Sequence, residues 1–144
     1  MKTNAYFTFL AVLLACMTRL QAASTIQFTA TSYPVAESAG SVPLTVQRFD
    51  DTNTIVGVDF TTLDGTAISG SKYTAISGTL AFAAGETNRI IVVPILNEGF
   101  VEGSKIFRVA LSNPTGGAVL GSRTNAIVTI TDNDVGIEFQ FSYR

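Results

Sequence analysis

The sequence lacks the residue types on which many enzyme mechanisms depend. It has no histidine and no tryptophan, and Cys16 is its only cysteine. Ser-His-Asp and Cys-His catalysis and imidazole metal sites are therefore closed to the chain alone. Nine basic residues against 11 acidic ones leave no positive excess for phosphate backbones, so we expect no nucleic-acid partner. A carboxylate pair for glycoside hydrolysis is the one catalytic arrangement left, and with nothing else in its support we expect no enzyme.

The first 23 residues have the order of a secretory signal peptide. Lys2 precedes an apolar run over residues 5–17, and small residues follow it at Ala22 and Ala23. The run is shorter than the roughly 20 residues that a membrane-spanning helix needs, and no later stretch comes close. We expect cleavage after Ala22 or Ala23, a mature chain without a transmembrane span, and a secreted or cell-surface location.

A second interpretation concerns Cys16. Leu13-Leu14-Ala15-Cys16 resembles a bacterial lipobox, in which the cysteine is acylated and becomes the new N-terminus. The signal would then end before Cys16, and the protein would be anchored to a membrane surface by lipid.

After cleavage the mature chain has 7 basic and 11 acidic residues, a net charge of −4, since Lys2 and Arg19 leave with the signal. Unless Cys16 stays as a lipid anchor, the exported chain has no cysteine. Without disulfides it must be held by core packing or by bound ions.

Beyond residue 23 the hydrophobic pattern has a period of two. Apolar residues alternate over 42–46, 107–111 and 126–130, and Ile90–Leu96 is almost wholly apolar. Clusters of Gly, Asn, Asp and Ser separate these runs. The pattern predicts an all-β, immunoglobulin-like sandwich of about seven antiparallel strands. Pro94 cannot donate a ladder hydrogen bond, so we expect it on an edge strand or at a bulge.

Most of the acidic residues fall in the predicted turns. In a sandwich, turns separated by an even number of strands lie at the same end, so distant carboxylates could meet there. Crowded carboxylates repel and favour a hard divalent cation, and Ca²⁺ takes about 6–8 oxygen ligands. The missing histidine and thiolate ligands argue against zinc and copper.

Five motifs resemble the Calx-beta domain family, in that family's order and spacing, over about residues 25–134. They are Tyr33-x-Val35-x-Glu37-x-x-Gly40-x-Val42, Asp64-Gly65-Thr66-Ala67, Gly78-Thr79-Leu80-x-Phe82-x-x-Gly85-Glu86-Thr87, Glu102-x-x-x-x-Phe107-x-Val109-x-Leu111-Ser112-Asn113-Pro114 and Ala126-x-Val128-x-Ile130-x-Asp132-Asn133-Asp134.

The resemblance implies a Calx-beta domain over residues 24–135 that binds Ca²⁺ at one end of its sandwich. By position it assigns the metal site to Glu37, Asp64, Asn97, Glu98, Glu102, Asp132, Asn133 and Asp134.

Several positions depart from the family pattern. Lys72 stands where the family often has Asp, and Lys105 falls on a further acidic position. The central acidic run, often three aspartates, reads Asn97-Glu98-Gly99. One or two weaker calcium sites are therefore expected rather than a full cluster.

The end of the sequence echoes its beginning. Ile137-Glu138-Phe139 matches Ile26-Gln27-Phe28 at an offset of 111 residues. Residues 136–144 are therefore either the start of a next repeat or a final exposed strand.

The function that these features predict is an exported calcium-binding module for extracellular or cell-surface interaction, adhesion or cell communication. Its ion would make one end of the sandwich rigid, and its partners would be other protein domains or cell-surface components. The alternative is a metal-independent structural or adhesive repeat that has lost its calcium site.

Overall fold

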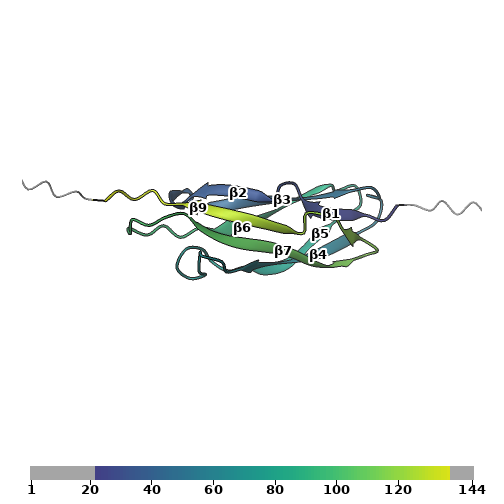
Figure 1. Ribbon diagram of the computed structural model, residues 1–144. Helices are drawn as coiled ribbons and strands as arrows, with labels where there is room; N and C mark the ends of the chain where they lie inside the picture. Colours follow the sequence, from purple (N-terminus) through teal and green to yellow (C-terminus); the bar gives the residue numbers. More distant parts are fainter. Residues whose placement is uncertain (1–21, 137–144) are drawn as a thin grey trace, which may run out of the picture.

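The computed structural model describes residues 22–136, which form a sandwich of two β-sheets (Figure 1). The first sheet has the order β6 (Asn88–Pro94), β3 (Ser41–Phe49), β1 (Thr25–Phe28), β8 (Val119–Leu120). The second has the order β2 (Ser32–Ala36), β9 (Asn125–Thr131), β7 (Lys105–Thr115), β4 (Val56–Leu63), β5 (Ser77–Phe82). The short 3-10 helix η1 (Glu37–Ala39) joins β2 to β3. Among residues 22–136, no helix is long and apolar enough to cross a membrane.

The predicted signal through Gln21, including Cys16, and the tail over 137–144 lie outside the described residues. The proposals on cleavage, lipid attachment and a following repeat therefore stay predictions.

The core forms because alternate residues of each strand point between the sheets. In β3 the buried positions include Val42, Leu44 and Val46, which are at most 3% exposed. Within the core, the ring of Tyr73 stacks on Phe107 with centroids 4.0 Å apart. The predicted period of two and the all-β sandwich are thus confirmed.

The number and direction of the strands differ from the prediction. The described residues hold nine strands, and the sheets are mixed, because β1 pairs with β8 and β2 with β9 in parallel. The chain leaves one sheet after Phe28 and enters the other at Ser32, so β1 and β2 are separate strands in different sheets. The very short β8 raises the number of strands further.

Pro94 ends β6, and β6 is an edge strand of its sheet, as predicted from the missing N–H of proline.

At the end of the sandwich where β1 begins, Arg48 is a buried cation. Its guanidinium donates hydrogen bonds to Ser24 Oγ at 2.6 Å, to the Ala83 carbonyl at 3.2 Å and to the Thr54 carbonyl at 2.7 Å. Arg48 is only 1% exposed, so it joins the start of β1 to two connecting loops inside the protein. A planar guanidinium can satisfy several carbonyls at once.

We predict that Arg48→Met destabilises the domain by roughly 3 kcal/mol or more, because each buried acceptor left without a donor costs about 1–3 kcal/mol. Urea unfolding measures the change. Arg108→Met is the control, since Arg108 is exposed on β7 and its loss should change stability by no more than about 0.5 kcal/mol. Equal effects of the two substitutions would contradict the role of Arg48.

Candidate metal centre

The strand directions bring four chain segments to the end of the sandwich opposite Arg48. The parallel strands β2 and β9 finish together, with Ala36 paired to Thr131. β6 ends beside the start of β3, where Pro94 pairs with Ser41. η1, the β6–β7 loop and the segment after β9 therefore meet at one pole. The β4–β5 loop joins them through a hydrogen bond from Leu96 N to the Lys72 carbonyl.

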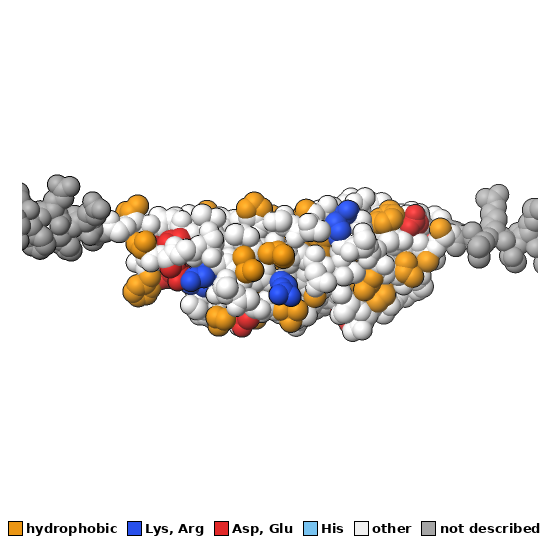
Figure 2. All heavy atoms as spheres, in the orientation of Figure 1, with side chains coloured by type: hydrophobic (Ala, Val, Ile, Leu, Met, Phe, Trp, Pro, Cys, Tyr) orange, Lys and Arg blue, Asp and Glu red, His pale blue; other side chains and the backbone are white. Residues whose placement is uncertain are grey.

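Three predicted ligands are gathered closely at this pole. Glu37, Glu98 and Asp134 each offer a carboxylate oxygen, and these oxygens all lie within 4.8 Å of one another. Glu102 and Asp132 adjoin them, and the Glu102 amide donates a hydrogen bond of 2.5 Å to Asp132 Oδ2. Figure 2 shows acidic and basic side chains side by side near the end toward which β9 runs. We call these five acidic residues the pole cluster.

Glu37 is the member of the pole cluster whose carboxylate has the fewest hydrogen-bonding partners. Its side chain is 3% exposed, and neither carboxylate oxygen has a hydrogen-bond partner. Asp134 Oδ2 is likewise buried and without a partner. A buried polar atom without a hydrogen bond costs about 1–3 kcal/mol, and more when it is charged. These oxygens point to a ligand that accepts carboxylate lone pairs.

A lysine supplies part of the missing positive charge. The Nζ atom of Lys72 forms ion pairs with Glu98 and Glu102 and lies 3.7 Å from Glu37 Oε1. Lys105 lies further out and pairs with Glu102 Oε2 at 3.2 Å. The central position of Lys72 was missed by sequence reasoning, although its replacement of a common family aspartate was the available signal.

The electrostatics of the pole differ from one residue to the next. Burial raises the pKa of Glu37 above its usual value, and Lys72 opposes that rise without cancelling it. The hydrogen bond from Lys72 lowers the pKa of Glu102, and the amides of Asp134 and Glu102 lower that of Asp132. Burial alone would lower the pKa of Lys72, but its bonds to Glu102 and Glu98 outweigh this and raise it.

Three predicted ligands stand apart from the pole cluster. Asp64 is exposed and accepts hydrogen bonds from the Tyr73 hydroxyl at 2.5 Å and the Ser69 amide at 2.9 Å. These bonds lower its pKa, and burial together with Asp64 raises the pKa of Tyr73 to about 12. Asn97 and Asn133 are exposed, and within residues 22–136 neither side chain bonds to the cluster. Asp64 therefore fixes its own loop and the aromatic stack.

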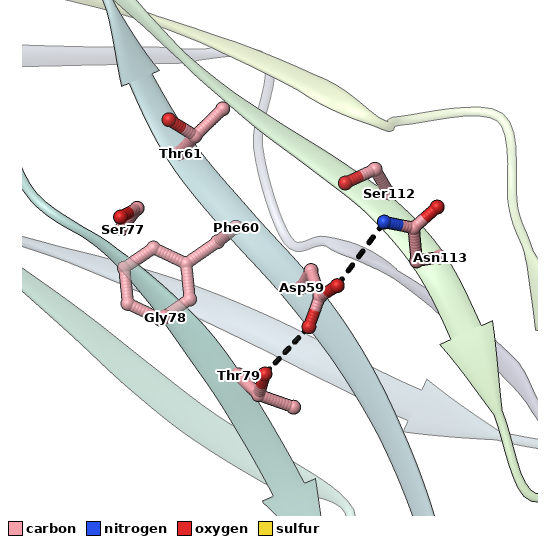
Figure 3. A pocket seen from close by; sticks show the side chains of 8 residues that line it. All are labelled: Asp59, Phe60, Thr61, Ser77, Gly78, Thr79, Ser112 and Asn113. Atoms are coloured by element: carbon pink, nitrogen blue, oxygen red, sulfur yellow. Dashed lines mark hydrogen bonds between the residues drawn. The ribbon is translucent and has the colours of Figure 1, made fainter.

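A shallow hollow of about 320 Å³ lies on the outer face of β4, β5 and β7 (Figure 3). The Asp59 carboxylate accepts hydrogen bonds there from Thr79 Oγ1 at 2.5 Å and Asn113 Nδ2 at 3.1 Å. These bonds lower the pKa of Asp59, with the Thr79 contribution the larger. No member of the pole cluster lines this hollow, so it is a separate surface feature.

The residues at the pole fit a hard divalent cation. Five carboxylates and two lysines carry a net charge of −3 when all are ionised. All the donors are oxygens, as Ca²⁺ prefers, and the unpartnered oxygens of Glu37 and Asp134 are buried among them. The ammonium of Lys72 limits how much positive charge the site can still accept.

Comparisons with known proteins find similar domains. The family model described as "Calx-beta domain" matches residues 20–134. The sodium/calcium exchanger 1 of Canis lupus familiaris is 37% identical over 136 residues, which cover 82% of this chain but only 14% of the exchanger. The extracellular matrix organizing protein FRAS1 of Mus musculus is 39% identical over 116 residues, covering 77% of this chain and 3% of that protein.

A solved structure is similar over most of the chain. The apo-form Calx CBD1 domain has a TM-score of 0.76 and 28% identity, covering 78% of this chain and all of that one. The described chain thus corresponds to one domain of the much longer relatives.

The raised pKa of Glu37 predicts a pH-dependent difference between the wild type and Glu37→Gln. The neutral form of Glu37 favours folding, so its contribution is full below its unfolded pKa and is lost as pH rises through the higher folded pKa. Glutamine keeps the neutral form. Without divalent cations, the stability of Glu37→Gln relative to wild type should therefore increase between about pH 4 and pH 8.

Urea unfolding in a chelator across this range measures the difference. Glu102→Gln is the matched control and should show the opposite sign, because the stabilisation from the lowered pKa of Glu102 is full above its unfolded pKa and is lost as pH falls through its folded pKa. A stability difference for Glu37→Gln that shrinks as pH rises would contradict the burial argument.

Proposed function

This chain belongs to the Calx-beta domain family, and on that premise we propose that it is an exported calcium-binding module whose ion makes one end of the sandwich rigid. The family is a regulatory calcium-binding one, not a catalytic one, and the chain is homologous to the calcium-binding domains of sodium/calcium exchangers. The observation that carries the proposal is the buried Glu37 carboxylate, whose two oxygens have no hydrogen-bond partner beside Glu98 and Asp134.

Glu37, Glu98 and Asp134 would hold the ion, with Glu102 and Asp132 beside them. Bound Ca²⁺ would supply positive charge and coordination to oxygens that no hydrogen bond reaches. Because Lys72 already pairs with Glu98 and Glu102, the number of ions is small and the affinity modest. Extracellular calcium modules work in the range of about 10⁻⁴–10⁻³ M, which suits such a site.

The expected mechanical effect follows from where the ligands lie. Glu37 belongs to η1, Glu98 to the β6–β7 loop and Asp134 to the segment after β9. One ion shared by these three segments would cross-link them without a covalent bond. The chain leaves the sandwich directly after Asp134, so the ion would also fix the angle toward whatever follows.

We place the protein outside the cell or at its surface, on the basis of the signal-like residues 1–23. A relative named for organising the extracellular matrix supports this setting. The proposal includes a role in adhesion or cell communication, with other protein domains or surface components as partners. Processing at Cys16 would add a lipid anchor and membrane association, and mass spectrometry of the mature N-terminus distinguishes it from cleavage near Ala23.

The second candidate function is a metal-independent structural or adhesive repeat. Lys72 favours it, because an internal ammonium already offsets part of the repulsion in the pole cluster. The two candidates differ in one measurable property, which is the response of stability to calcium.

We predict that about 1 mM Ca²⁺ raises the melting temperature of the mature chain by the equivalent of roughly 0.4–1.4 kcal/mol, for a Kd of about 10⁻⁴–10⁻³ M. Differential scanning calorimetry in about 1 mM Ca²⁺ and then in chelator measures it. Glu37→Gln should lose the shift, because it removes a charged buried ligand. Asp50→Asn should keep it, since Asp50 is exposed and bonds to Thr25 in β1. An unchanged melting temperature in the wild type would favour the metal-independent repeat.

We further predict that Lys72→Gln strengthens calcium binding by about tenfold or more while it destabilises the calcium-free protein. Removing a unit charge about 4 Å from a divalent ion relieves roughly 2–8 kcal/mol of repulsion, depending on the effective dielectric. Isothermal titration calorimetry gives the affinity. Lys105→Gln is the control, because Lys105 is more exposed and contacts only Glu102, so its effect should be smaller. Weaker binding by Lys72→Gln would show that Lys72 does not compete with the ion.

A further inference from the structure

We propose that the outer edge of β6 accepts an added β-strand, and that the strand is segment Ile137–Tyr143 of a second copy of this chain. The proposal concerns the side of the sandwich and does not depend on calcium binding.

The backbone of β6 has hydrogen-bonding groups that face away from its sheet. Arg48 N donates to the Thr87 carbonyl at 2.7 Å, whereas the Thr45 carbonyl accepts from Thr29 N, beside β1. The backbone N–H and C=O groups of even-numbered β3 residues therefore point toward β6. They pair with odd-numbered β6 residues, as Leu44 does with Ile91. The N–H and C=O groups of Ile90 and Val92 consequently point outward. No hydrogen bond to them occurs within residues 22–136.

The open edge has a defined length. At its end near the pole cluster, the Pro94 carbonyl accepts a hydrogen bond from Thr74 N at 3.0 Å, and proline has no N–H to offer. The free stretch therefore covers Asn88–Val92, long enough for a short strand.

Beyond Asn88 and the exposed Arg89 at its start, this edge carries large apolar side chains. Ile90 is 57% and Val92 54% exposed, and the β3 residues paired with them are Thr45 and Pro43, neither of them charged. Four consecutive β-branched residues, Ile90–Val93, give the strand a high tendency to pair. Proteins usually guard such edges with charge, proline or very short strands.

The other sheet edges carry that protection. β2 has an exposed proline, Pro34, at its centre, and β8 is only two residues long. β5 presents the small or polar residues Ser77, Thr79 and Ala81 at its outer edge. Among the edges in the described part of the chain, β6 alone combines free backbone groups with large apolar side chains.

The segment after the sandwich has the pattern of a matching strand. Residues 137–143 alternate apolar and polar side chains as Ile137, Glu138, Phe139, Gln140, Phe141, Ser142 and Tyr143. Its first three residues repeat the pattern of Ile26-Gln27-Phe28 in β1. Aromatic residues opposite β-branched ones are favourable cross-strand pairs, so this segment suits the stripe formed by Ile90 and Val92.

The direction of the chain favours a second copy over the same molecule. After β9 the described chain runs outward along the long axis to Gly136, away from the body of the sandwich (Figure 1). The described chain therefore ends beyond the pole, whereas β6 lies along the side. A tail that binds the side of the next copy makes a heterologous contact, which generates an open chain of molecules.

Sedimentation velocity of residues 23–144 tests the proposal, from about 10 μM to 1 mM protein in chelator. We expect association that grows with concentration, and at least about a tenfold weaker association after deletion of 137–144. The double substitution Ile90→Lys with Val92→Lys should have the same effect, because charge on the edge opposes pairing. Ile55→Lys is the control for an exposed isoleucine, at 73% exposure outside any strand, and should associate like the wild type.

A monomer at every concentration would overturn the proposal, as would unchanged association of the deleted chain or of the β6 double variant. Circular dichroism and an unaltered calcium response show whether the β6 variant is folded.

Amide exchange locates the contact. Peptide 136–144 added to residues 23–136 should slow exchange of the Ile90 and Val92 amides by about tenfold or more, and leave that of Ile91 unchanged, since it already bonds to β3. A peptide of the same composition without the alternation should have no effect. Protection at β5 or β2 instead of β6 would overturn the assignment.

Discussion

A carboxylate that is buried without a hydrogen bond dominates the chemistry of this domain. Glu37 follows β2 directly, and the parallel pairing of β2 with β9 carries it to the segment that bears Asp132 and Asp134. The strand topology, rather than any local motif, decides that these acids meet. Their mutual repulsion and the loss of hydration then require a positive charge at the pole.

Both ends of the sandwich bury charged groups, but these groups are compensated differently at each end. Arg48 is a buried cation whose N–H groups find carbonyl and hydroxyl oxygens, so its end is closed by internal bonds. At the pole cluster, Lys72 and Lys105 offset part of the negative charge, and three buried oxygens stay without a donor. The protein itself therefore supplies hydrogen-bond partners for the buried cation at the Arg48 end. At the pole cluster, three buried oxygens have no such partner within the described residues.

Much of the fold could be predicted from the sequence because strand periodicity is a local property. The alternation of Val42, Leu44 and Val46 identified a core strand, and the missing N–H of Pro94 placed it at an edge. The sheet change between Phe28 and Ser32 could not be predicted, because it depends on which partner strands are within reach.

The candidate site was predictable in part. The family resemblance assigned Glu37, Glu98, Glu102, Asp132 and Asp134 to the site, and all five lie in the pole cluster. The same resemblance also assigned Asp64, whose carboxylate accepts hydrogen bonds from Tyr73 and Ser69 instead. A sequence does not show which neighbouring donor an acidic side chain will bond to. Lys105 was expected to oppose a cation, whereas the central ammonium belongs to Lys72, whose long side chain reaches across from another loop.

The covalent attachment of that ammonium has a consequence for the order of events during biosynthesis. A tethered cation has an effective concentration that neither dilution nor chelation changes. The polypeptide can therefore close this pole as soon as its strands assemble, even in a compartment poor in divalent metal. Under the proposed export and calcium binding, the domain would reach its destination already compact, and calcium there would adjust its stiffness without being a condition for maturation.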